Sequence, residues 1–309
     1  MDIRIRELSY NDLNPQYLHT VRSEQSPENN LISDKHDIAA VYTPSEPDAY
    51  AVYNSQAVKS AEINPKLIGK MKVYLKDMGF YNGEMGGTVT EELKKSLISF
   101  QRAYLSPTNF DNLKNGISVF LIGKVDEVGA AYYTNYSDGR ATAALKALGV
   151  TDPSAEIKKN FARIWTFLDK GMSCTTDQIA GILGNVMQEC RFNELSENKT
   201  TGAFGIFQWK ADRRSYLEHF ASEYGGDSKN IGTQLAYFRY EVSVTWGKDH
   251  LGRYAQNSHL VDGWKEFMRD CTTNYDTAAV DFMKKIEGTK ANEAERRVYA
   301  KAICNAIKK

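Results

Sequence analysis

Residues 175–213 read TTDQIAGILGNVMQECRFNELSENKTTGAFGIFQWKADR, and the first part of this stretch predicts a helix. Thr175 and Gln178 have the spacing of a capping box, in which each side chain bonds to the backbone of the other residue. The three-to-four-residue spacing of one buried helix face follows at Ile179, Ile182, Leu183, Val186 and Cys190. We therefore expect a helix that starts after Thr175 and ends close to Cys190.

Glu189 falls on the border of that buried face. At 100° per residue it lies about 70° from the centre of the apolar stripe, so we expect a partly buried carboxyl. Burial and the negative end of the helix dipole both raise the pKa of a carboxyl in such a place. A raised pKa suits a general acid that donates a proton near neutral pH. Helix geometry alone favours the plainer alternative, an edge glutamate on an amphipathic helix.

A segment rich in glycine and aromatic residues, GAFGIFQW at residues 202–209, follows after a short polar loop. Its glycines allow a tight turn and close backbone approach, and its aromatic rings offer faces on which sugar rings pack. Taken alone, the segment is equally compatible with a small buried hairpin.

Together, the Glu-x-x-Phe-Asn segment at residues 189–193 and the GAFGIFQW segment resemble the goose-type lysozyme and lytic transglycosylase superfamily. The Gln-Trp pair followed by Arg213 is most similar to the phage tail lysozyme family. The resemblance extends over about residues 155–305 and includes QLAYFRYEV and AVDFMKKIEGTKANEAERRVYAKAI. It implies a helical lysozyme-like domain that cleaves the β-1,4 bond between N-acetylmuramic acid and N-acetylglucosamine in bacterial peptidoglycan.

The resemblance also implies roles for individual residues. Glu189 matches the catalytic acid, and Gln208 and Trp209 match the substrate-facing wall of the cleft. Phe192 and Gly205 belong to the same two motifs and are expected to bind substrate. No metal or organic cofactor is implied. The chain departs from the family at Cys190, where a serine is usual, and its spacing from the acid to the first motif glycine is one residue longer than in transglycosylases.

A second catalytic carboxylate is not singled out by any motif. The candidates are Glu194, Glu197, Asp212 and Glu241. An inverting hydrolase needs a base about 6.5–9.5 Å from the acid, whereas a transglycosylase can use the sugar's own hydroxyl, and both outcomes stay open. We expect Glu241 to pair with an arginine rather than act as a base, and Glu287 to form a buried pair with Arg297.

Residues 67–104 predict two helices joined by a tight loop. One apolar face repeats from Leu67 to Met78, Gly79 stops that helix, and residues 88–91 (TVTE) have the form of a capping box for the next helix. The run at 67–101 resembles the small three-helix peptidoglycan-binding module, and DGRATAAL at 138–145 resembles its last helix. Tyr81, in the loop, would then contact the peptide stem or the sugar, or it would simply pack the loop.

Residues 106–136 would be an insertion in that module, and their β-branched and aromatic runs predict a small hairpin. Residues 1–60 contain four prolines and no sustained pattern. They predict an extended arm, an irregular cap on the next domain, or a docking segment for other tail or baseplate proteins. The expected protein is therefore mainly α, with an arm (1–60), a peptidoglycan-binding-like domain (61–151) and a lysozyme-like catalytic domain with a small hairpin (152–309).

Composition and charge limit the classes of partner that the chain is expected to bind. Lys plus Arg equals Asp plus Glu, at 39 each, so no net charge draws the chain to nucleic acid or to an anionic membrane. The longest apolar runs are far shorter than the roughly 20 residues that cross a bilayer. The start, MDIRIRELSYND, carries charges where a secretory signal needs an apolar stretch. We expect a chain that is made in the cytoplasm, does not insert into membranes, and reaches the wall by a pore, by lysis or on a particle.

The four cysteines, which lack CxxC spacing and a nearby histidine cluster, predict buried thiols rather than a zinc site or bridges. They are Cys174, Cys190, Cys271 and Cys304. Three functions remain: a wall hydrolase carried by a phage tail or tail-like particle, which we favour, a free endolysin with the same chemistry, and a non-catalytic tail component that binds the wall. The arm and the insertion motivate the last of these.

Overall fold

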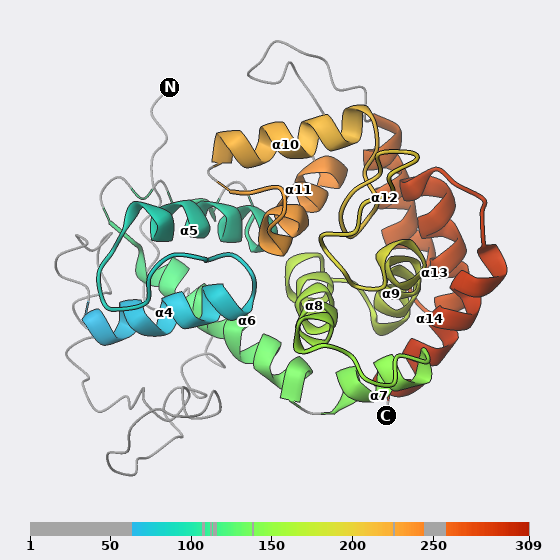
Figure 1. Cartoon of the computed structure of the whole chain (residues 1–309), viewed down its shortest axis with the longest axis horizontal. Helices are drawn as coiled ribbons and strands as arrows, with labels where there is room; N and C mark the ends of the chain where they lie inside the picture. Colours follow the sequence, from blue (N-terminus) through green and yellow to red (C-terminus); the bar gives the residue numbers. More distant parts are fainter. Residues whose placement is uncertain are drawn as a thin grey trace.

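The chain is mainly helical in a computed structural model that describes residues 64–106, 109–111, 113, 116–137, 139–224, 226–243 and 258–308 (Figure 1). The expected arm, residues 1–60, lies outside the described residues. Eleven α-helices form within them: α4 (Pro65–Asp77), α5 (Glu91–Tyr104), α6 (Val119–Ser137), α7 (Arg140–Ala147), α8 (Ala155–Thr166), α9 (Thr176–Cys190), α10 (Asp212–Tyr224), α11 (Ile231–Ser243), α12 (Ser258–Asp270), α13 (Tyr275–Phe282) and α14 (Glu293–Ile307). The expectation of a mainly α protein is confirmed.

Two short π-helical segments extend helices of this set. They are η4 (Phe167–Gly171), which continues α8, and η5 (Met283–Glu287), which continues α13. The second segment matters for the site because its last residue is a buried carboxyl.

The hairpin expected within residues 106–136 is wrong, because α6 occupies Val119–Ser137. The apolar residues of this stretch also have helical spacing, and the buried set includes Leu121, Val125, Val128 and Tyr132. α6 packs against α4 and α8. Burial between two helices therefore overrides the strand preference of the β-branched and aromatic residues, which is weak and depends on context.

The first two helices form as predicted, with one shift. α4 ends at Asp77 and Gly79 follows with a φ of 83°. The second helix begins two residues later than expected, because Thr90 rather than Thr88 is its N-cap and accepts a hydrogen bond from the backbone N–H of Leu93 at 3.2 Å.

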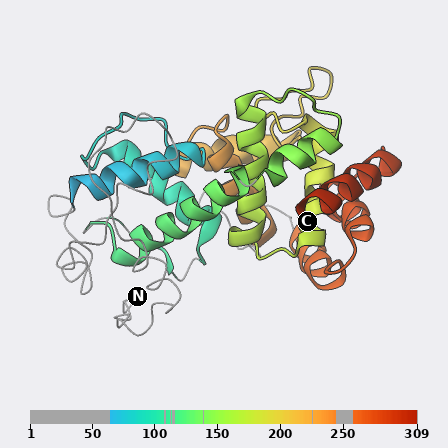
Figure 2. The same ribbon diagram turned by 90° about the horizontal axis from the view of Figure 1, so that it is seen from below.

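The buried residues of α4–α7 and α8–α14 belong to one continuous hydrophobic cluster. Polar contacts also join the two sets: Arg239 donates to the carbonyl of Ala103 at 2.9 Å, and Arg163 donates to the carbonyl of Asp77 at 2.7 Å. Seen from below, the molecule extends from the α4–α5 end to the α13–α14 end (Figure 2). The domain boundary near residue 151 stays a prediction.

α9 lies at the centre of the C-terminal half and is buried almost all round, not on one face only. It packs against α8, α13 and α14. Gly184 permits a close approach of α14, since a Cβ on it would lie 2.8 Å from the backbone nitrogen of Ala300. This contact sets α14 directly beside the C-terminal half of α9.

Two further expectations can be compared with the described residues. All four cysteines are free and buried, as predicted. In the described part of the chain, no helix has the length and apolar character needed to cross a membrane.

Candidate active site at the end of helix α9

Helix α9 carries Glu189 as its next-to-last residue. The predicted capping box is confirmed at its start: Gln178 N–H donates to the Thr175 hydroxyl at 3.3 Å, and Thr175 N–H donates to Gln178 Oε1 at 2.8 Å. At its end the backbone turns sharply through Arg191 and Phe192, which have φ values of 52° and 62°. The Glu189 side chain is 21% exposed, so the expectation of a partly buried carboxyl is confirmed.

The GAFGIFQW segment forms a tight turn against this helix end. Phe204 and Trp209 exchange both backbone hydrogen bonds, each at 2.9 Å, which closes the turn. The thiol of Cys190 donates to the carbonyl of Ile206 at 3.6 Å. The structure therefore brings the two sequence motifs together, although twelve residues separate Glu189 from Gly202 in the chain. In place of a regular hairpin, isolated antiparallel bridges join Phe204 to Glu197 and to Trp209.

Gly205 is required by the shape of the turn. Its φ is 81°, and a Cβ on it would lie 2.8 Å from Oε1 of Gln234. That oxygen accepts a hydrogen bond from the N–H of Ile206 at 3.0 Å, while Gln234 Nε2 donates to the carbonyl of Glu194 at 2.9 Å. One buried amide on α11 thus fixes both the turn and the loop that precedes it.

Two of the predicted substrate-binding residues lie inside the protein. Trp209 is 0% exposed, and its indole N–H donates to Oε2 of Glu241 at 3.1 Å. Phe192 is also fully buried, against Phe161. Their side chains support the turn and the helix end from beneath and present no surface to solvent.

Gln208 is the predicted wall residue that keeps an accessible side chain. Its Nε2 donates to the carbonyls of Ser196 and Gly205, at 3.1 and 3.0 Å. These two bonds hold the amide in one orientation.

Tyr81 lies far along the chain from this site, and its side chain is fully buried in the α4–α5 loop. Its hydroxyl donates to the carbonyl of Glu84, and its ring lies 5.5 Å from Nζ of the buried Lys72. The structure therefore shows the loop-packing alternative for Tyr81.

Glu241 pairs with an arginine, as expected. Its side chain is 0% exposed and receives two hydrogen bonds from Arg213, at 2.7 and 2.8 Å. Arg213 also donates to the carbonyl of Ile286 at 3.1 Å. The pair therefore ties the end of the turn to η5.

Arg296 on α14 bridges two carboxyls. Its Nη2 contacts Oε1 of Glu189, and its Nη1 lies 2.5 Å from Oε2 of Glu287. The predicted partner of Glu287 was therefore wrong by one position. Arg297 lies about 100° further round the helix and contacts Asp276 and Glu293 instead.

Burial raises the pKa of Glu287 to about 8, and the negative charge of Glu189 adds to the rise. Arg296 and Arg213 oppose it. Glu287 therefore holds its proton at neutral pH. Sequence reasoning missed Arg296, although the Arg-x-x-x-Ala spacing of the closing segment identifies it. Four residues after Arg296 comes Ala300, whereas four residues after Arg297 comes Lys301.

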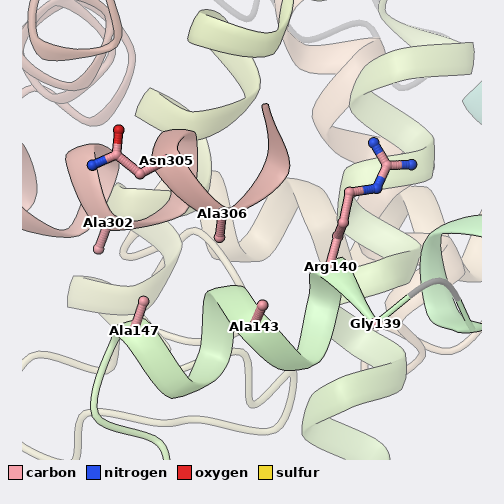
Figure 3. Close-up of a pocket in the computed structure, with 7 residues that line it drawn as sticks. All are labelled: Gly139, Arg140, Ala143, Ala147, Ala302, Asn305 and Ala306. Carbon is pink, nitrogen blue, oxygen red and sulfur yellow. The ribbon is translucent and has the colours of Figure 1, made fainter. Parts of the chain in front are cut away.

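A surface depression of about 460 Å³ lies elsewhere, between α7 and α14 (Figure 3). Its lining is mostly small: Gly139, Arg140, Ala143, Ala147, Ala302, Asn305 and Ala306. It contains none of the predicted site residues. In the described residues, no group of His, Cys, Asp and Glu could hold a metal ion.

A half-buried glutamate beside a carboxyl that retains its proton at neutral pH has the chemistry of an acid–base hydrolase.

Residues 159–307 match the family model described as phage tail lysozyme. The match runs from α8 to the end of α14, and it implies a glycoside hydrolase domain with peptidoglycan as substrate. It does not include α4–α7, so no comparison supports a peptidoglycan-binding module there. No curated protein and no solved structure matches the chain.

Proposed function

We propose that the chain is a peptidoglycan hydrolase that cleaves the β-1,4 bond between N-acetylmuramic acid and N-acetylglucosamine, with Glu189 as the proton donor. The observation that carries the proposal is the phage tail lysozyme match over residues 159–307, which includes a glutamate that is 21% exposed at the end of the buried helix α9. That carboxyl combines access for a substrate with a partly desolvated environment, as a general acid requires.

In the proposed reaction, Glu189 gives its proton to the glycosidic oxygen as the bond from that oxygen to the muramoyl C1 breaks. A water molecule, or the sugar's own hydroxyl, then adds to C1 and gives up its proton to the Glu189 carboxylate or to a second carboxylate. Gln208 supports substrate binding because its Nε2 is fixed on two carbonyls, which orients Oε1 as an acceptor for a sugar hydroxyl or acetamido N–H. The backbone of the turn at residues 202–208, with Gly205 at its bend, holds the same sugar.

Trp209 and Phe192 contribute to this site by packing beneath it. Both side chains are fully buried, so we assign them to the shape of the cleft rather than to stacking on a sugar. Glu241 is fully engaged by Arg213 and Trp209, which argues against a role as the base. The products distinguish a hydrolase from a transglycosylase. A hydrolase leaves a reducing end and a transglycosylase a 1,6-anhydro end, and mass spectrometry separates the two by the mass of one water.

We further propose that the enzyme travels on a phage tail or tail-like particle, from the family match and from the length of chain that precedes it. Residues 1–60 are then the attachment to other tail or baseplate proteins, and residues 61–151 a peptidoglycan-binding-like module. Mass spectrometry of purified particles tests the location: the chain is expected among the particle proteins, whereas a free endolysin would appear only in the lysate.

Glu189→Gln tests the acid. The variant should fold like the parent, since glutamine has nearly the same shape, and should lose about 10²–10⁴-fold in activity, the usual contribution of a general acid. Activity is measured as the loss of turbidity of a cell-wall suspension and as release of muropeptides. Glu218→Gln is the matched control, because this exposed carboxyl on α10 is also paired with an arginine, Arg214. Full activity in Glu189→Gln would remove the proposed acid.

A wall-binding tail component without activity is the competing function. It predicts that the parent chain binds purified wall in a pull-down but releases no muropeptides. Release of muropeptides by the parent, abolished in Glu189→Gln and retained in Glu218→Gln, excludes it.

A further inference from the structure

One guanidinium, that of Arg296, lies between two carboxyls that come from different parts of the chain. Glu189 comes from the end of α9, Glu287 from the end of η5. The Arg296 side chain is 2% exposed, and its Nε donates to the carbonyl of Ala291 at 3.1 Å. Its Nη1 also donates to Oδ1 of Asn185, whose own amide is held by backbone carbonyls on α9 and α13 at 2.8 and 2.9 Å. The bridge is therefore rigid on the side of the arginine.

The two carboxyls differ in their surroundings. Glu189 keeps contact with solvent, while the Glu287 side chain is 6% exposed. Oε1 of Glu287 is buried and has no hydrogen-bond partner in the described part of the chain. Oε2 is paired with Arg296, but the share of a carboxylate charge on Oε1 would be neither solvated nor hydrogen-bonded, which is costly. A proton removes that charge, so the buried oxygen favours the protonated form of Glu287 in the free enzyme.

The charged groups around Glu287 act on its pKa in opposite directions, and burial outweighs the two guanidiniums. Glu189 approaches from α9, Arg296 from α14, and Arg213 from the start of α10. On its own segment, the ammonium of Lys285 pairs with Asp281 and Glu266, and that of Lys284 with Glu293. Two guanidiniums and one carboxylate thus face a buried carboxyl that retains its proton.

We propose that Glu189 and Glu287 share a single proton across Arg296, and that Glu287 is a positioning residue which keeps this proton in the site until substrate covers Glu189. The inference rests on the proposed function. A bound sugar removes the solvent around Glu189, which favours its neutral form. The proton then leaves Glu287 and is carried by Glu189, the negative charge passes to Glu287 beside Arg296, and the net charge of the site does not change.

This arrangement keeps the acid available at neutral pH. The resting form carries the proton on Glu287 and the active form carries it on Glu189, so both forms hold one proton. The ratio of active to resting form therefore does not depend on pH. The population of the active form falls only at the pH where the pair loses that proton. Without Glu287, Arg296 faces Glu189 alone, and each rise in pH removes the proton from the only carboxyl that carries it.

Glu287→Gln tests the proposal through the pH profile of kcat/KM on soluble muropeptide oligomers. Glutamine resembles the neutral carboxyl in shape and has no proton to exchange. We expect the alkaline limb of activity to move to lower pH by at least about one unit, which at pH 7.5 is roughly a tenfold loss. Glu293→Gln on α14 is the control, since it removes an exposed partner of Arg297 and should keep the parent limb. An unchanged limb in Glu287→Gln, with or without a loss of thermal stability, overturns the proposal.

A second measurement needs no activity and serves even if Glu287→Gln does not fold. In ¹³C-glutamate-labelled protein, the carboxyl resonance of Glu287 should titrate near pH 8 in the parent and at clearly lower pH in Glu189→Gln, which lacks the negative charge on α9. Titration at the same pH in both proteins means that the carboxyls are not coupled and overturns the proposal. If Glu189→Gln keeps its activity while this coupling is present, the proposed function fails and the proton sharing stands.

Discussion

Replacing Glu287 by glutamine should change how the stability of the fold depends on pH. Burial raises the pKa of this carboxyl from an ordinary value of 4.5 to about 8 in the folded protein. Between these two values the folded chain holds a proton that the unfolded chain has released. The free energy of unfolding therefore falls as the pH rises through this window, and levels off above pH 8.

The size of the effect follows from the width of the window. One bound proton gives a slope of at most about 1.4 kcal/mol per pH unit, and the whole interval amounts to at most about 5 kcal/mol. Glu287→Gln has no titrating carboxyl at this position in the folded or the unfolded state. Its free energy of unfolding should therefore lack this dependence on pH. Its stability relative to the parent should therefore increase steadily from pH 5 to pH 8.

Urea unfolding followed by circular dichroism, at pH 5, 6, 7 and 8 and constant ionic strength, measures this difference. Glu293→Gln is the control of opposite sign, because hydrogen bonds from Arg297 and Lys284 lower the pKa of that exposed carboxyl. The stability that the ionised Glu293 contributes is present above its ordinary pKa and is lost only in acid. Between pH 5 and 8, the free energy of unfolding of Glu293→Gln should therefore run parallel to that of the parent. A parallel curve for Glu287→Gln as well would refute a buried carboxyl that is neutral at pH 7.

Three further predictions concern the supports of the site. Arg213→Met should reduce the free energy of unfolding by about 3–5 kcal/mol, since Glu241 is then a buried charge without a cation; a loss below about 1 kcal/mol in denaturant unfolding would contradict the buried pair. Gly205→Ala should cost more stability than Gly202→Ala, because both glycines have positive φ but only Gly205 lacks space for a Cβ; equal thermal shifts would show that the turn relaxes. Burial raises the pKa of the Cys190 thiol to about 12, so at pH 8 it should react roughly a thousandfold more slowly with a disulfide reagent than a free cysteine does, as pulse labelling with peptide mapping will show against the unfolded chain.

Local signals in the sequence were reliable where neighbouring residues decide the outcome. The capping box at Thr175 and the end of α4 before Gly79 both depend on hydrogen bonds or angles within one or two helical turns. The single buried face expected for α9 was wrong, because other helices and the turn cover it almost all round. The hairpin expected within residues 106–136 failed because strand preference is a property of the packing environment, and α6 is packed between α4 and α8.

Polar pairing in the site was predictable only in part. Glu241 was expected to meet an arginine, and the structure supplies Arg213. Glu287 was assigned to Arg297, and its partner is Arg296, since a shift of one residue on a helix rotates a side chain by about 100°. Which guanidinium faces inward depends on how α14 is rotated against α9, and α14 lies with its backbone at Arg296 and Ala300 close to Gly184 of α9.

By itself the sequence determined the helix that carries Glu189, the class of protein that its motifs resemble, and the buried state of the cysteines, because periodicity and capping act over short distances along the chain. Only the tertiary structure decided that Trp209 lies under the turn instead of facing a cleft, and that a second carboxyl, Glu287, meets Glu189 through Arg296. Glu189 and Arg296 lie 107 positions apart in the chain, and Trp209 and Glu241 lie 32 apart. Burial, which determines where a proton is held, exists only after the helices have packed.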